Sequence, residues 1–265
     1  MDPDLQGKVV FVTGAARGMG RTYVEGFLED GCKVVASDVS WAPTGRSHDG
    51  AVEFRQQLDE NPNALALDLD ITDDAQLVEA RDRTVEAFGT VHVLVNNGAK
   101  RMNTILPSGR IDVLDMDMSD FEHMMDINVN GVVKTIRVLA PLMIAQGFGS
   151  IVNISGGNGG TGGDGPYGAS KAGIVNLTLT LASELRKHNI AVNAIHPAQP
   201  RSHGYEEQVA ARAAEGVTVP PPVRIEAHLP PARLLAKQDA IGGLTGQILD
   251  VRQWNMQHGL GGFAE

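Results

Sequence analysis

Short runs of apolar residues recur along the chain, each bounded by glycine, polar or acidic positions. Most of them are rich in valine, isoleucine and leucine and lack alternating polar residues, as is typical of strands buried on both faces. The pattern predicts strands at residues 8–13, 33–37, 64–70, 91–96, 150–155, 190–195 and 246–251.

Longer stretches with helical spacing of apolar residues separate these runs. They predict helices at residues 18–30, 49–60, 73–88, 119–146 and 166–188. Strands that alternate with helices form βαβ units, whose right-handed crossovers place helices on both faces of a parallel sheet. We therefore expect an α/β fold with a doubly wound, seven-stranded parallel sheet in a single domain over residues 1–265.

The segment 203–231 departs from this alternation, because EEQVAARAAEG is followed by the proline-rich stretches VPPP and LPP. A long segment with little regular structure is often a lid over a binding site. We expect a substrate-binding lid here, and a disordered surface loop is the alternative.

Charge and composition narrow the possible partners. With 22 basic and 32 acidic residues the chain carries a net charge of −10, which would repel nucleic acid and anionic membranes. Cys32 is the single cysteine, so an internal disulfide is excluded and a reducing compartment is expected. The start of the chain, MDPDLQGK, lacks a signal-peptide pattern, and no window approaches the ~20 apolar residues of a membrane span. These features indicate a cytoplasmic protein.

Two kinds of catalytic site find no support in the motifs. The eight histidines are scattered without an HExxH motif or a Cys/His cluster, and no GxSxG motif occurs. Neither a metal site nor a serine hydrolase is expected.

The first predicted strand runs into TGAARGMG, residues 13–20, at the start of a helix. Glycines at such a turn let backbone N–H groups and the helix N-terminus face a pyrophosphate. They stand at Gly14, Gly18 and Gly20, a spacing that differs from GxGxxG but follows the same physics. The turn therefore predicts a dinucleotide site.

Asp38 ends the second predicted strand, 18 residues after Gly20. A carboxylate there accepts hydrogen bonds from both ribose hydroxyls of NAD and repels the 2′-phosphate of NADP. Arg17 argues the other way, because it could reach that phosphate. We weigh Asp38 as more decisive and expect NAD; an NADP-linked carbonyl reductase is the alternative.

Further motifs follow in one order, namely DI at 70–71, NNGA at 96–99, INVNG at 127–131, IVNIS at 151–155 and YGASK at 167–171. With the glycine turn and Asp38 they resemble the classical short-chain dehydrogenases/reductases, from about Lys8 to Val251. The resemblance implies a Rossmann-type fold, a homodimer or homotetramer, and hydride transfer between an alcohol and a nicotinamide cofactor.

Tyr167 and Lys171 lie four residues apart and so share one face of a helix. A nearby ammonium favours the phenolate, so Tyr167 can remove the hydroxyl proton of an alcohol while hydride leaves for the cofactor. The resemblance adds that Lys171 holds the nicotinamide ribose and that Asn128 anchors a water of a proton relay. It implies a cofactor site of Gly14, Arg17, Gly18, Met19, Gly20, Asp38, Val39, Asp70, Ile71, Asn96, Gly98, Tyr167, Lys171, Pro197, Pro200 and Ser202.

The stretch SGGNGGTGGDGPYGASK, residues 155–171, has the composition of a flexible linker. It joins the fifth strand to the helix that carries Tyr167, the place where open parallel sheets bind ligands. We interpret it as an active-site loop.

The family's catalytic serine is the second small residue after this strand, and that position is Gly156 here. Ser155, one residue earlier, carries the nearest hydroxyl and is assigned the role. Asn158 or Thr161 could orient the substrate oxygen instead.

Other motifs also depart from the family. Asn-Asn-Gly-Ala replaces Asn-Asn-Ala-Gly, Pro197-Ala198 replaces Pro-Gly, and LDVRQWNMQHGLGG replaces the usual acidic-Gly-Gly ending. Trp254 and Met256 of this ending could form an interface or a pocket wall.

Several cations fall in segments expected around the substrate, namely Lys100, Arg101, Arg110, Arg201, His203 and Arg224. In an acidic protein they suggest a polar secondary alcohol, such as a sugar, sugar acid or hydroxy acid. Solvated loop charges are an equal alternative, and the single aromatic residue of the lid, Tyr205, argues against a steroid. A non-catalytic NAD-binding sensor or scaffold is the rival from another class, kept open by Gly156.

Overall fold

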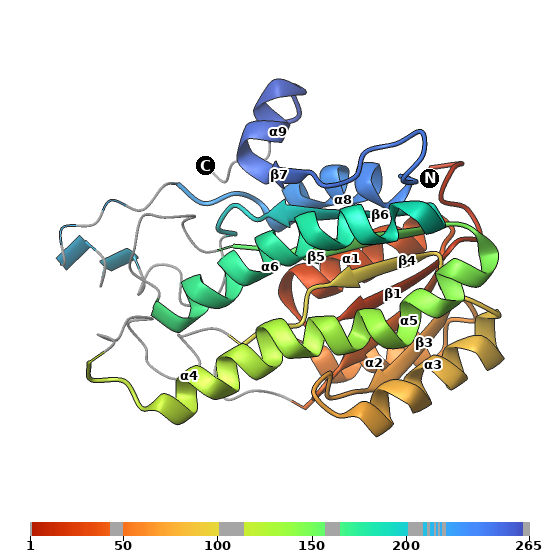
Figure 1. Ribbon diagram of the computed structural model, residues 1–265, viewed down its shortest axis with the longest axis horizontal. Coiled ribbons are helices and arrows are strands. Elements are labelled where there is room, and N and C mark those ends of the chain that lie inside the picture. Colours follow the sequence, from red (N-terminus) through yellow and green to blue (C-terminus); the bar gives the residue numbers. More distant parts are fainter. Residues whose placement is uncertain are drawn as a thin grey trace.

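The computed structural model of the chain describes residues 2–42, 50–100, 114–156, 165–200, 209–210, 213–214, 216, 218 and 221–261. Within these residues, seven strands form one fully parallel sheet in the order β3-β2-β1-β4-β5-β6-β7 (Figure 1). The strands are β1 (Val9–Thr13), β2 (Lys33–Asp38), β3 (Ala64–Asp68), β4 (Val93–Asn96), β5 (Gly149–Ile154), β6 (Ile190–His196) and β7 (Ile248–Asp250). The predicted Rossmann-type sheet is confirmed.

Helices cover both faces of the sheet (Figure 1). One layer holds α1 (Gly18–Glu29), α2 (Ala51–Asp59) and α8 (Leu229–Ala236), and the other holds α3 (Asp74–Phe88), α5 (Val132–Gln146) and α6 (Gly165–Leu185). In β1, Val10 and Val12 belong to the hydrophobic cluster under α1, whereas Phe11 belongs to the cluster under α5. Because neighbouring strand residues point to opposite faces, apolar strands of this kind need both layers.

The strand order reverses between β1 and β4. The chain runs outward from β1 through β2 to β3 and then crosses back to β4 on the other side of β1. Connections after β1 and β4 therefore leave toward opposite faces, and a crevice opens beyond the carboxyl ends of these two strands. The glycine turn follows β1 and the NNGA motif follows β4, so the topology brings both motifs to this crevice.

A π-helical turn interrupts the predicted helix 119–146. The structure has α4 (Met118–Met125), a π-helical turn at Asp126–Gly131 and then α5. Such turns occur frequently at functional sites, and this one carries Asn128.

The same helical run, Met118–Gln146, is long and apolar enough by length and composition to cross a membrane, which the sequence pattern had not led us to expect. Its part α5 packs on the sheet, with Ile136, Leu139 and Met143 in the core. The apolar residues of α5 are thus explained by the packing of a core helix.

The last predicted strand ends early, and a helix replaces its end. β7 stops at Asp250, whose side chain caps α9 (Val251–Gln257) by accepting a hydrogen bond from the N–H of Gln253 at 2.8 Å. The side chain of Asn255 on α9 donates to the carbonyl of Ala227 at 2.9 Å. The divergent C-terminal ending therefore stabilises the segment around Ala227.

The segment 203–231, which was predicted as a lid, is described in part. Its residues Ile225–His228 form a 3-10 turn, and α8 begins at Leu229. Residues 203–208 lie outside the described part of the chain.

An ion pair fixes α8 to the end of α1. The carboxylate of Asp30 is 3% exposed and accepts a hydrogen bond from Nε of Arg233 at 2.5 Å. Replacing Arg233 with alanine removes this hydrogen-bonded cation from the buried carboxylate. We expect the free energy of unfolding to fall by about 2–4 kcal/mol in urea melts, the lower end reflecting the partial exposure of Arg233.

Arg81→Ala is the matched control for this prediction. Arg81 pairs with Asp82 at 2.7 Å, but the side chains are 35% and 62% exposed. We expect this change to cost at most about 0.5 kcal/mol. Equal losses in the two variants would contradict a stabilising role for the buried pair.

Candidate active site

The glycine turn between β1 and α1 is packed so closely that side chains are excluded at two of its positions. A Cβ on Gly20 would lie 1.9 Å from the carbonyl oxygen of Gly14, and a Cβ on Gly14 would lie 2.6 Å from Cα of Gly98. Gly18 differs, because a Cβ there would meet nothing within 4 Å and its φ is +54°. Gly20 and Gly14 let the backbone close up, and Gly18 leaves the wall of the crevice open to a ligand.

The second asparagine of the NNGA motif joins the turns after β1 and β4. The side chain of Asn97 donates to the carbonyl of Gly14 at 2.9 Å and to that of Thr13 at 3.1 Å. Asn96 points instead into the sheet, where it is 3% exposed and donates to Asn153 at 2.9 Å. Asn97 lines the crevice, whereas Asn96, which was predicted as a cofactor contact, does not line it.

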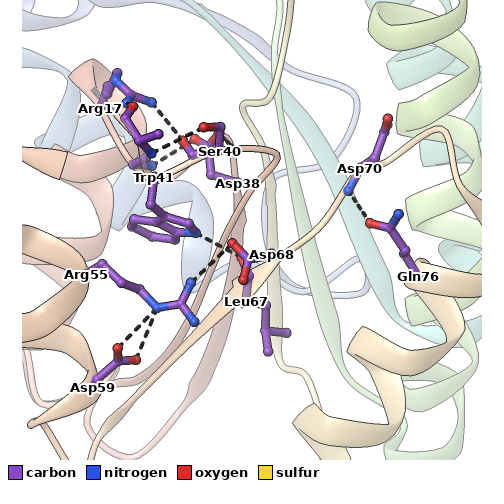
Figure 2. A network of polar contacts seen from close by, with 12 residues as sticks. Arg17, Asp38, Ser40, Trp41, Arg55, Asp59, Leu67, Asp68, Asp70 and Gln76 are labelled. Atoms are coloured by element: carbon purple, nitrogen blue, oxygen red, sulfur yellow. Dashed lines mark hydrogen bonds and ion pairs between the residues drawn. The ribbon is translucent and has the colours of Figure 1, made fainter. Parts of the chain in front are cut away.

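Asp38 is held at the end of β2 by two backbone donors (Figure 2). Its carboxylate accepts from the N–H of Ala16 at 2.9 Å and from the N–H of Ser40 at 3.2 Å. Burial raises the pKa of the Asp38 carboxyl, while these two N–H groups and the guanidinium of Arg17 lower it and partly offset the burial. The carboxylate is thus fixed at the crevice in one orientation.

The crevice forms a cavity of about 600 Å³ beyond the carboxyl ends of the strands, a size typical of ligand sites. Most of the predicted cofactor residues line it, namely Gly14, Arg17, Gly18, Met19, Asp38, Val39, Asp70, Ile71, Gly98, Tyr167, Lys171, Pro197 and Pro200. Two of the predicted residues, Gly20 and Asn96, are packed beneath the lining residues and do not line the cavity. Ser202 lies outside the described residues.

Tyr167 and Lys171 enter the cavity from the first turns of α6. The ammonium of Lys171 lies 5.7 Å from the centroid of the Tyr167 ring and donates to the carbonyl of Ile154, at the end of β5, at 2.8 Å. The Lys171 side chain is 3% exposed, so its charge acts in a site largely closed to water. A phenol and a buried ammonium therefore share one end of the cavity.

Asn128 does not line the cavity itself. Its side chain bonds to both backbone groups of Lys100, at 2.7 Å and 3.0 Å, and donates to the hydroxyl of Ser170 at 3.0 Å. The hydroxyl of Ser170 in turn donates to the carbonyl of Tyr167 at 2.8 Å. The π-helical turn is thereby tied to the first turn of α6, with Tyr167 on it.

Ser155 is turned away from the cavity. It is 0% exposed, and its hydroxyl donates to the carbonyl of Ile195 on β6 at 3.0 Å. Gly156 faces the site instead, since a Cβ there would lie 3.2 Å from the Tyr167 hydroxyl. The geometry thus does not bring Ser155 to the phenol; the alternatives Asn158 and Thr161 lie outside the described residues.

Sequence reasoning missed several lining residues. Besides Asn97 they are Leu69, Ala99, His123, Ile127, Ile154 and Ile225. Asn97 and Ala99 belong to the NNGA motif and Ile154 to IVNIS, so these motifs contained the signal. Ile225 lies within the segment 203–231 that was predicted as a lid, whereas nothing in the sequence pattern linked His123 on α4 to the site. Of the cations expected around a substrate, Lys100 lines the cavity, Arg224 is exposed outside it, and Arg101, Arg110, Arg201 and His203 are outside the described residues.

The site suits a dinucleotide. Gly18 leaves open space at the N-terminus of α1, where anions are favoured, and a fixed carboxylate stands at the end of β2. Tyr167 and Lys171 stand at another part of the same cavity wall. Among the described residues, no group of three His, Cys, Asp or Glu side chains could hold a metal ion.

Comparisons with known proteins agree with this geometry. The family model described as short chain dehydrogenase matches residues 8–211. The chain is 40% identical to a fluoren-9-ol dehydrogenase of Terrabacter sp., over 98% of this chain and 75% of that protein. It is 36% identical to a 3-alpha-(or 20-beta)-hydroxysteroid dehydrogenase of Mycobacterium tuberculosis, over 74% of this chain and 70% of that protein. The crystal structure of a carveol dehydrogenase from Mycobacterium avium in complex with NAD superposes with a TM-score of 0.76 at 25% identity, covering 93% and 96% of the two chains.

Proposed function

The chain belongs to the short-chain dehydrogenase family, and on this premise we propose that it oxidises a secondary alcohol with NAD. The observation that carries the proposal is the Tyr167–Lys171 pair, whose ring and ammonium lie together at one wall of the cavity. NAD, when bound, supplies the acceptor for the hydride of the alcohol carbon.

The side chains of this chain move the proton. The buried ammonium of Lys171 favours the phenolate of Tyr167, which accepts the hydroxyl proton of the alcohol as general base. In the reverse direction Tyr167 is the general acid toward the carbonyl oxygen. Asn128 acts through Ser170 to fix the backbone of Tyr167, and in addition is proposed to anchor a water of the proton relay. Ser155 takes no part in this mechanism.

Asp38 is proposed to select NAD over NADP. Two N–H donors fix its carboxylate at the cavity, where ribose hydroxyls would donate to it and a 2′-phosphate would be repelled. We expect Asp38→Asn to raise the KM for NAD about tenfold, since charge-assisted hydrogen bonds are lost, and to leave kcat nearly unchanged. An unchanged KM for NAD, or a wild-type enzyme that prefers NADP, would support the alternative of an NADP-linked carbonyl reductase.

We propose an apolar ring alcohol as the substrate, in preference to the polar class that the loop cations suggested. Around the Tyr167 hydroxyl, the space at Gly156 is bordered by Cγ of Pro197 and Cγ of Lys171, 3.8 Å and 3.9 Å from a Cβ at that position. These neighbours are apolar atoms, which suits an alcohol with apolar substituents. The relatives named above carry the names of dehydrogenases of alcohols on ring systems.

The test is the formation of NADH absorbance from purified protein, NAD and a panel of secondary alcohols. The panel contains fluoren-9-ol, monoterpene and steroid alcohols, sugars, sugar acids and hydroxy acids. We expect turnover on the apolar ring alcohols. Turnover confined to sugars or acids would restore the polar class, and NAD binding without any turnover would favour a sensor or scaffold.

We further propose a cytoplasmic homo-oligomer, a dimer or tetramer. The free thiol of Cys32 is buried, as suits a reducing compartment. Ile144 on α5 and Leu179 on α6 are 39% and 48% exposed, and apolar side chains on these helices fit contacts between subunits.

A further inference from the structure

We propose that Arg17 is a positioning residue that braces the start of the loop after β2, residues 39–42, called the loop below, and that it is not a ligand for a cofactor phosphate. The inference rests on the proposed use of NAD. It concerns the one feature of the sequence that argued for NADP.

The guanidinium of Arg17 donates to two backbone carbonyls of that loop. Nη1 donates to the carbonyl of Ser40 at 2.9 Å (Figure 2). Nη2 donates to the carbonyl of Ala42. Both acceptors lie just beyond Asp38 in the chain. A guanidinium presents its donors in a rigid planar fork, so one arginine can hold both carbonyls at once.

This contact is the third in a series. The N–H of Ala15 donates to the carbonyl of Ser37 at 3.0 Å, and the N–H of Ala16 donates to the carboxylate of Asp38 at 2.9 Å. Residues 15, 16 and 17 of the glycine turn thus each donate to the end of β2 or to the loop that follows it. The loop and the carboxylate are positioned together from the glycine turn.

Trp41, which lies between Ser40 and Ala42 in the chain, fixes the loop to β3 and α2. Its indole N–H donates to the carbonyl of Leu67 on β3 at 3.3 Å, and its ring packs on Phe54 with 6.3 Å between centroids. Arg55 lies over the Trp41 ring at 5.2 Å (Figure 2). Trp41 is 7% exposed, so the loop is anchored in the core between the two carbonyls that Arg17 holds.

A phosphate ligand would compete with these bonds. A 2′-phosphate that bound the same face of the Arg17 guanidinium would displace the carbonyls of Ser40 and Ala42, and the segment that follows Asp38 would lose its brace. The structure therefore assigns cofactor choice to Asp38 and assigns Arg17 to the placement of Asp38. In consequence, removing the charge of Asp38 lifts the repulsion of NADP without providing a ready partner for its phosphate.

The two roles are separated by the dissociation constants of NADH and NADPH, measured through cofactor fluorescence in wild type, Asp38→Asn, Arg17→Ala, Arg17→Lys and the double variant D38N/R17A. For a brace, R17A weakens both cofactors by the same factor, about fivefold to tenfold, in the wild-type and the D38N backgrounds. Lysine, a point charge that can reach only one carbonyl, restores part of the affinity for both cofactors. A loss for NADPH at least tenfold larger than for NADH in the D38N background, rescued by lysine, would overturn the proposal.

Trp41 provides a readout that needs no cofactor. The chain has two tryptophans, so in a Trp254→Phe background the emission comes from Trp41 alone. We expect R17A to shift this emission to the red, because the loop opens to water, and Arg137→Ala, which removes an equal charge from an exposed site on α5, to leave it in place. An unshifted emission in R17A would contradict the brace even if wild type bound no dinucleotide, whereas failure of wild type to bind NADH would count against the proposed function alone.

Discussion

Tyr167→Phe is expected to lower kcat about 10³-fold while leaving the dissociation constant of NADH within about twofold of wild type. The change removes the only atom of the phenol that can carry the proton. It retains the ring, which packs beside the ammonium of Lys171 at 5.7 Å, so the wall of the cavity should keep its shape. Single-turnover absorbance and NADH fluorescence measure the two quantities separately.

The matched control for this variant is Tyr23→Phe. Tyr23 on α1 is 0% exposed, and its hydroxyl has no hydrogen-bond partner among the residues that the structure describes. Removing a buried hydroxyl without a partner should leave kcat unchanged and stability equal or slightly higher. If Tyr167→Phe kept wild-type turnover, the general-base mechanism would be wrong, and an equal loss in both variants would indicate nonspecific damage.

The fold could be predicted because the strands are short, apolar and buried on both faces. Few folds bury both faces of such strands. In β1, Val10 and Val12 pack into the hydrophobic cluster on one face of the sheet, and Phe11 packs into the cluster on the other face. The π-helical turn at Asp126–Gly131 could not be predicted, because one extra residue in a turn barely alters apolar spacing. The helix α9 was hidden for a different reason. Its first residue, Val251, follows Ile248 and Leu249 closely enough to be included in the predicted strand 246–251.

The site could be predicted to the level of motifs but not always to the residue. Asn96 and Ser155 were both selected, but the residue after Asn96, Asn97, lines the cavity, and a Cβ on the residue after Ser155, Gly156, would lie 3.2 Å from the Tyr167 hydroxyl. Adjacent residues at the end of a strand point to opposite sides, so an error of one residue exchanges the site for the core. Sequence motifs do not fix this parity, because the exact residue at which a strand ends depends on the packing of its neighbours.

The role of Gly156 leads to a second large expected effect. Its φ of +141° is a conformation that residues with a Cβ rarely adopt, and a Cβ would stand 3.2 Å from the Tyr167 hydroxyl. Gly156→Ala should therefore push the phenol or the strand end out of place. Since small displacements of a catalytic group can cost about 10²-fold, we expect kcat to fall by about that factor with little change in NADH binding.

Two comparisons make the Gly156 prediction decisive. In Gly168→Ala the new methyl group, one residue after Tyr167, would meet nothing within 4 Å, so this variant should keep wild-type kcat. Ser155→Ala removes a hydroxyl that donates to the carbonyl of Ile195, so it should lower stability by about 1 kcal/mol and leave kcat within a few-fold. A loss of kcat in Ser155→Ala as large as that in Tyr167→Phe would return the catalytic role to Ser155. The Ser155 hydroxyl would then have to point into the cavity, and not to the carbonyl of Ile195 as in this structure. Wild-type kcat in Gly156→Ala would mean that catalysis tolerates a side chain at position 156. The absence of a side chain beside the Tyr167 hydroxyl would then not be required for the reaction.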